Sequence, residues 1–189
     1  MKAEILVITD RSGSMGAIAK DVIGGYNTFI EDQKKVPGEA KVTFTQFDTY
    51  YEVVYAGKTL TDVPMLDHNT FIPRGGTALL DAIGRTLNEQ GQRIATEDWA
   101  DLVIVCIITD GEENSSREFT RERIQEMTAH AEKNGWKFIY IGANQNSFQV
   151  AQGLGMKQAI TANYVANAAG TAEAYRGVTA SVTNLRTGN

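Results

Sequence analysis

The sequence predicts an α/β fold in which helices cover both faces of a mostly parallel sheet with one antiparallel edge strand. Three observations predict this architecture. Short apolar, β-branched runs alternate with segments of helical periodicity, as in a parallel sheet with crossover helices. Residues 102–109 read LVIVCIIT, and such continuous hydrophobicity indicates a central strand buried on both faces. Two strand patterns at 41–47 and 50–55 lie too close together for a crossover, so they are expected to pair antiparallel.

The first half of the chain begins with a buried strand and a long helix. Residues 4–9 read EILVIT, which is typical of a parallel strand. Residues 15–34 carry apolar groups at helical spacing, although Gly24 and Gly25 lie inside the pattern and cost a helix about 1 kcal/mol each relative to alanine. These glycines either allow close packing against the sheet or mark a break in the helix. Residues 57–74 are polar and irregular, so we expect a long loop with at most one short helix.

The second half continues the alternation of helices and strands. We expect helices at 80–94, 144–154 and 171–185, and a strand at 136–141. Another helix is expected to follow a capping box formed by Ser115 with Glu118. We expect a single domain over residues 1–189, with its core at about 3–155 and a helical C-terminal extension of unassigned role at 156–189.

The composition excludes several classes of protein. Of the 189 residues, 42% are hydrophobic and 22% charged, as in an ordinary soluble domain, and the net charge of -5 argues against general nucleic-acid binding. The single cysteine, Cys106, excludes a disulfide within the chain and a zinc–cysteine cluster. No apolar run approaches the ~20 residues that a membrane helix needs, and no signal-peptide pattern precedes the first strand. We therefore expect a cytoplasmic protein with no membrane contact.

Polar residues follow two of the expected parallel strands at the point where each strand ends. DRSGS at 10–14 follows the first strand, GGT at 75–77 opens a helix, and TDG at 109–111 ends the central strand. Ligands of open α/β sheets bind outside the carboxyl ends of the strands. If these two strands are neighbours, the following side chains surround one crevice: Asp10, Ser12, Ser14, Thr77 and Asp110. Because every donor is an oxygen, the set favours a hard cation, Mg²⁺ first and Mn²⁺ or Ca²⁺ as alternatives.

These motifs resemble the metal-ion-dependent adhesion site (MIDAS) of von Willebrand factor type A (vWA) domains, whose pattern is Asp-x-Ser-x-Ser, a distant Thr and a distant Asp. The order of elements is also similar over about residues 3–155. SGSM and TDGEEN are most similar to the small intracellular bacterial members, including those of tellurite-resistance clusters. The resemblance implies a Rossmann-like fold, a metal held by the five residues named above, and a role in protein binding. It implies no catalytic residue.

Three functional hypotheses follow: a binding module, an enzyme, and a structural subunit. The first is a metal-dependent protein-binding module, in which a carboxylate of a partner protein fills the open coordination position of the ion. The second is a Mg²⁺-dependent phosphohydrolase with Asp10 as nucleophile, although that chemistry needs a second acid where the chain has Ser12. The third is a structural or assembly subunit with an incidental metal, because Asp and Ser after a strand are also ordinary turn and cap residues. Arg11 occupies the variable position of the motif, and whether its side chain faces the ligand stays open.

Overall fold

In the computed structural model, which describes residues 1–189, six strands form one sheet in the order β3-β2-β1-β4-β5-β6. The strands are β1 (Lys2–Asp10), β2 (Glu39–Phe47), β3 (Tyr51–Thr59), β4 (Leu102–Thr109), β5 (Lys137–Ala143) and β6 (Ile160–Tyr164). Every neighbouring pair is parallel except β2 and β3, so β3 is a reversed edge strand. The predicted mostly parallel sheet with an antiparallel edge is confirmed.

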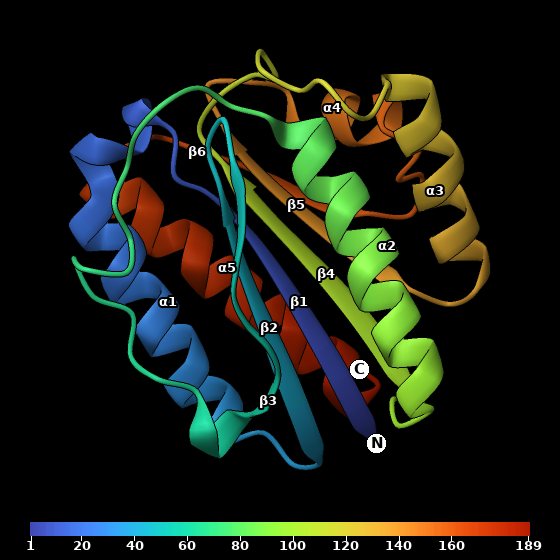
Figure 1. Ribbon diagram of the computed structural model, residues 1–189. Coiled ribbons are helices and arrows are strands. Elements are labelled where there is room, and N and C mark those ends of the chain that lie inside the picture. The colour runs from blue at the N-terminus through green and yellow to red at the C-terminus, as the bar shows by residue number, and fades with distance from the viewer.

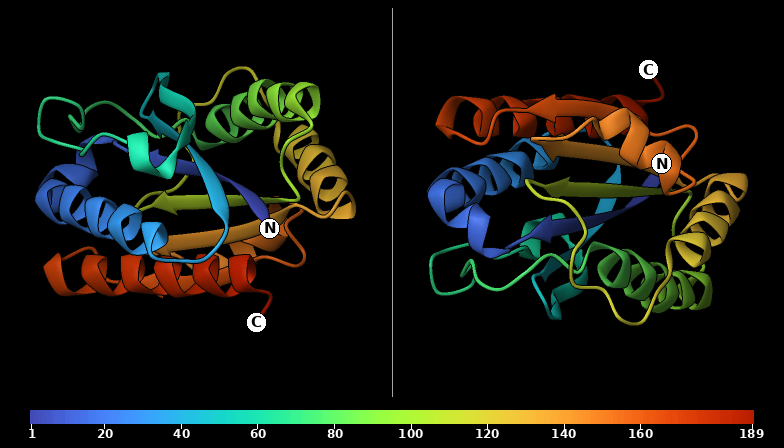
Figure 2. Two further views of the ribbon diagram at one scale, coloured as in Figure 1. Left: turned by 90° about the horizontal axis from the view of Figure 1, so that it is seen from below. Right: turned by 90° about the horizontal axis from the view of Figure 1, so that it is seen from above.

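Helices cover both faces of this sheet (Figure 1). They are α1 (Ala19–Lys34), α2 (Leu79–Glu97), α3 (Arg121–Lys133), α4 (Ser147–Gly153) and α5 (Ala168–Thr187), with 3-10 turns η1 (Gly13–Ile18) and η2 (Leu60–Asp62). Helices α1 and α5 pack on one face, and α2, α3 and α4 pack on the other. The end-on views in Figure 2 show the sheet between these two helical layers. Both chain termini lie at the end of the molecule opposite the carboxyl ends of the parallel strands (Figure 1).

The central strands are hydrophobic throughout because each of their faces enters a different core. Along β1, Ile5 and Val7 pack in the core beneath α1 and α5, whereas Leu6 and Ile8 pack in the core beneath α2, α3 and α4. Cys106 lies opposite Val7 on β4 and is fully buried, as expected of a core cysteine. Successive side chains of a strand point to opposite faces of the sheet, so an alternating pattern would place polar side chains in one of the two cores.

The start of α3 differs from the prediction. No capping box forms between Ser115 and Glu118, because both residues precede the helix. The hydroxyl of Thr120 caps α3 instead, accepting from the Arg123 N–H at 3.2 Å. Glu118 pairs with Arg85 of α2, whose Nε donates to it at 2.9 Å, and the backbone N–H groups of residues 117–119 donate to the carboxylate of Asp81 in α2. The pairing partner lies far away in the sequence, so local spacing could not identify it.

The C-terminal segment contributes more than the helical extension that the sequence predicted. Residues 160–164 form β6, which pairs parallel with β5, and α5 then packs beside α1. Strand β6 reads ITANY, and most of its side chains are at least partly exposed because it is the edge strand of the sheet. An edge strand needs no continuous apolar run, so the sequence pattern that identified β1 and β4 is absent here.

Two adjacent glycines in α1 have different surroundings, and neither breaks the helix. A Cβ atom at Gly25 would lie 2.4 Å from Cδ2 and 2.6 Å from Cγ of Tyr175 in α5, whereas a Cβ atom at Gly24 would have no neighbour within 4 Å. The close packing that the sequence suggested therefore occurs against α5 and not against the sheet. None of the helices combines the length and apolar character that crossing a bilayer requires.

Candidate metal centre

The two aspartates of the predicted site end neighbouring parallel strands. Asp10 is the last residue of β1, and Asp110 directly follows β4. Because β1 and β4 pair in parallel, with Thr9 opposite Ile108, both carboxylates are at the same edge of the sheet. This is the edge at which ligands of open α/β folds bind.

The two serines connect the first loop to the second aspartate. After β1 the chain turns into η1, and the hydroxyl oxygens of Ser12 and Ser14 lie 3.1 Å apart. The Ser14 hydroxyl donates to Oδ1 of Asp110 at 2.7 Å. Ser12 is buried and Ser14 is exposed, so this row of oxygens extends from the interior to the surface.

Thr77 reaches the same place from the loop before α2. Its N–H donates to Oδ1 of Asn114 at 2.9 Å, and its carbonyl accepts from the Asn114 N–H at 3.0 Å. A Cβ atom at Gly111 would lie 3.4 Å from the Thr77 hydroxyl oxygen, so this hydroxyl adjoins the residue that follows Asp110. Asn114 was not predicted as a site residue, although it lies only three residues after the TDG motif.

Asp10 is fully buried and both of its oxygens are engaged. Oδ1 accepts from the Ser12 N–H at 2.6 Å, and Oδ2 accepts from the Thr109 hydroxyl at 2.7 Å. Thr109 was another residue that the sequence reasoning did not single out, although it precedes Asp110 in the motif. Together these contacts fix the carboxylate at the base of the site.

Negative charge at this site has no positive partner within the protein. Neither Asp10 nor Asp110 forms an ion pair. Burial raises the pKa of both carboxyl groups, and the charge of Asp110 raises the pKa of Asp10 further. Two neighbouring carboxylates without a basic partner are unfavourable in a buried site unless a cation compensates them.

The donor chemistry of the site fits a hard divalent ion. No three His, Cys, Asp or Glu side chains are arranged so that they could hold a metal ion, so a site here depends on hydroxyl oxygens as well as carboxylates. Two carboxylates balance the charge of one divalent cation, and the three hydroxyls add neutral oxygen donors. Mg²⁺, Mn²⁺ and Ca²⁺ prefer such all-oxygen sets.

Arg11, within the same motif, points away from the site. Its Nε donates to Oδ2 of Asp48 at 2.8 Å and its Nη1 donates to Oε2 of Glu52 at 2.5 Å, and its side chain is only 4% exposed. The alternative in which Arg11 faces a ligand is therefore wrong. Asp48 was not predicted either, although it directly follows β2 at the same end of the sheet.

Comparison with known proteins identifies the fold. No family model and no curated protein matches the sequence. Among solved structures, the PilB minor pilin from Streptococcus sanguinis has a TM-score of 0.69 at 13% identity, over 97% of this chain and 61% of the pilin. PTMP1 from the mussel byssus, with a zinc-occupied MIDAS motif, has a TM-score of 0.66 at 15% identity, over 96% and 46%. The vWF domain of the pili tip protein Mfa5 from Porphyromonas gingivalis has a TM-score of 0.65 at 13% identity, over 95% and 94%. The chain thus spans less than two thirds of the first two proteins.

Proposed function

Because this chain has the von Willebrand factor type A fold, we propose that it is a protein-binding module that uses a divalent cation to bind a carboxylate of a partner protein. One observation carries the proposal. The buried pair of carboxylates, Asp10 and Asp110, has no basic partner, and serine hydroxyls connect it to the surface. The residues that would hold the ion are Asp10, Ser12, Ser14, Thr77 and Asp110.

The charge and number of donors support a carboxylate as the partner's contact. A divalent ion bound by two carboxylates and neutral hydroxyls carries no excess negative charge that would repel an incoming anion. When bound, the ion supplies a positive charge and a coordination position for that anion. PTMP1 has a similar fold and a MIDAS motif occupied by zinc, which supports a divalent ion in this chain. The all-oxygen donor set supports Mg²⁺.

The burial of Asp10 argues against the phosphohydrolase alternative. A nucleophile has to approach the substrate's phosphorus atom, but Asp10 is fully buried and both of its oxygens accept hydrogen bonds. Ser12 occupies the position where such an enzyme would need a second carboxylate. We propose binding without catalysis for these reasons. We also propose that residues 1–189 form one domain, since β6 and α5 extend the same sheet and the same helical layer.

Thermal unfolding tests the metal site. An ion at about 100 times its Kd adds about 2.7 kcal/mol to stability, which raises the Tm of a domain of this size by about 5–10 °C. We expect this rise with Mg²⁺, relative to EDTA, in the parent protein and in the control Ser181→Ala, whose serine lies on α5. Ser12→Ala should lose most of it. A response of equal size in Ser12→Ala would contradict the proposed site.

Carboxylate recognition needs a separate test, because an incidental metal would also raise the Tm. Fluorescence anisotropy would compare short peptides carrying one Asp or Glu with otherwise identical peptides carrying Asn or Gln, in Mg²⁺ and in EDTA. Some acidic peptides should bind in Mg²⁺ alone, and their amide counterparts should not bind. Binding that is unchanged in EDTA, or unchanged with the amide peptides, would favour the assembly-subunit hypothesis.

A further inference from the structure

A cluster of four charged side chains, two buried and two about half exposed, lies beside the candidate metal centre. Asp48 accepts from Nε of Arg11 at 2.8 Å and from Nε of Arg74 at 3.0 Å, both at the same carboxylate oxygen, Oδ2. Arg11 also contacts Glu52 at 2.5 Å. The proposed metal site uses none of these four side chains.

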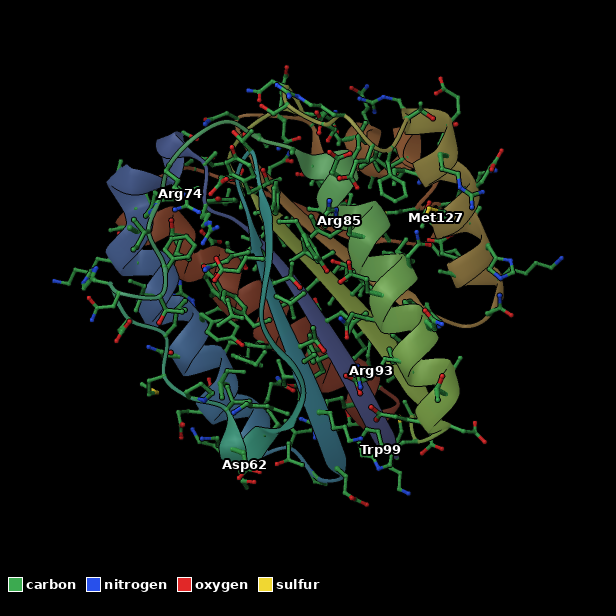
Figure 3. The ribbon with its side chains drawn as sticks, viewed as in Figure 1. Asp62, Arg74, Arg85, Arg93, Trp99 and Met127 are labelled. Carbon is green, nitrogen blue, oxygen red and sulfur yellow. The ribbon has the colours of Figure 1, made fainter.

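Asp48 is the centre of this cluster and is firmly held. Its side chain is 1% exposed, and its second carboxylate oxygen accepts from the Tyr50 N–H at 2.7 Å. Its carbonyl accepts from the Ala78 N–H at 3.0 Å, which connects it to the segment that carries Thr77. Arg74 is 57% exposed and lies near the upper end of the molecule in Figure 3. Asp48 is therefore placed to fix the direction of the buried Arg11 side chain.

The charges of the cluster balance without Asp10 or Asp110. Two arginines face two acidic residues, so the cluster is neutral, and the two site aspartates keep their negative charge. Arg11 directly follows Asp10 in the sequence, which makes it the basic residue nearest to the site along the chain. Without Asp48, the one acid left to the buried Arg11 guanidinium is Glu52, which is 49% exposed. A buried guanidinium that loses a buried partner is unfavourable, which favours contact with another buried carboxylate. The Arg11 side chain forms ion pairs with Asp48 and Glu52 and with no other residue.

We propose that Asp48 is a positioning residue for the metal centre: it holds the Arg11 guanidinium away from Asp10 and Asp110, and so leaves those two carboxylates for a divalent cation. The inference rests on the proposed function, because it concerns which cation neutralises the site. Without Asp48, the guanidinium of Arg11 competes with the metal ion for the carboxylates of Asp10 and Asp110. The donor atoms of the site are unchanged in that case, but the ion has to displace an arginine.

An ion pair with one buried carboxylate, at the opposite end of the sheet, provides a matched control. Glu4 is 1% exposed and pairs with Arg93 of α2, which lies near the lower end of the molecule in Figure 3, far from Arg74. Glu4→Gln breaks an ion pair of similar burial without approaching the metal centre. It therefore shows whether the loss of any buried carboxylate charge weakens metal binding, or only the loss of Asp48.

The test is calorimetric titration of the full chain with MnCl₂, with Tm in EDTA measured in parallel. Asp48→Asn should weaken Mn²⁺ binding about tenfold or more, the scale of an arginine's effect beside a carboxylate. The double variant Asp48→Asn with Arg11→Gln should bind within about threefold of the parent, because the competing charge is gone. Arg11→Gln alone should also stay within about threefold. Glu4→Gln should leave the Kd unchanged.

Each outcome decides between a charge-holding role and a merely structural one. If Asp48 only supports the loops, the double variant will bind Mn²⁺ as weakly as Asp48→Asn, and that result overturns the inference. Parent-like affinity in Asp48→Asn also overturns it. Should Asp48→Asn fail to fold, a tenfold loss in Arg11→Gln refutes the idea on its own, and retained affinity supports it. A parent protein that binds no Mn²⁺ refutes the proposed function itself, and this inference with it.

Discussion

Gly24 and Gly25 provide a matched pair of substitutions with opposite expected effects. Both are inside α1, where alanine is favoured over glycine by about 1 kcal/mol. They differ only in what a new methyl group would meet. At Gly24 the space is open, whereas at Gly25 the methyl carbon would lie within 3.0 Å of two ring atoms of Tyr175. Tyr175 is almost fully buried, so its ring has little room to move.

The structure gives the size of each effect. Gly24→Ala should gain about 0.4–1 kcal/mol, because alanine loses less backbone entropy on folding. Gly25→Ala has the same gain but also forces α1 and α5 apart, and overpacking of this kind costs about 1–3 kcal/mol. We therefore expect a Tm about 1–4 °C higher for Gly24→Ala, and a Tm lower by several degrees for Gly25→Ala.

Scanning calorimetry in EDTA measures both variants without any contribution from bound metal, and urea unfolding provides the free energies. The sign of the difference between the two variants is the decisive result. If Gly25→Ala is as stable as Gly24→Ala, the close contact between α1 and Tyr175 does not constrain the fold, and the reasoning from helix packing is refuted. A second variant, Gly25→Ala with Tyr175→Leu, should recover stability relative to Gly25→Ala if the ring is the obstacle.

Three further predictions concern buried polar groups. Asp10→Asn should raise the Tm in EDTA and abolish the Mg²⁺-dependent rise, because burial makes the charge of Asp10 unfavourable without an ion; a lower Tm in EDTA would contradict this. Arg186 is buried and donates to the carbonyl oxygens of Gln33 and Gly38. Arg186→Met should therefore lower the free energy of unfolding in urea by about 2–4 kcal/mol. A loss under about 0.5 kcal/mol would show that these contacts are dispensable. Burial raises the pKa of Glu4 despite its ion pair, so its contribution to stability is full below its ordinary pKa and is lost as the pH rises through the raised value. In urea unfolding between about pH 4 and pH 7, the free energy of unfolding of the parent should therefore fall relative to that of Glu4→Gln as the pH rises. Parallel dependence of the two free energies on pH would contradict this expectation.

The sequence predicted the elements whose identity depends on local pattern. The run at 102–109 could only be a strand buried on both faces, and the polar residues just after it and after β1 had to meet once those strands were neighbours. The hairpin of β2 and β3 followed from the shortness of its connection. In each case, the deciding information lay within a few residues of the feature that was predicted.

Features that depend on contacts between distant residues were missed. Strand β6 is an edge strand without an apolar run, so only its pairing with β5 defines it. The start of α3 lies beyond Glu118, whose side chain pairs with Arg85 and whose N–H donates to Asp81, both on another helix. Asp48 was overlooked because its importance comes from Arg11 and Arg74, and no spacing rule connects these three positions.

The positions of the two chain ends determine how the molecule can be attached to something else. Strand β1 starts and helix α5 finishes at the end remote from the candidate metal centre. A linker, tag or neighbouring domain joined at either end would therefore leave the carboxyl ends of the strands facing free solution. Immobilising the protein through its N-terminus or through its C-terminus should thus give equal access to a soluble ligand, with the candidate metal centre pointing outward from the support.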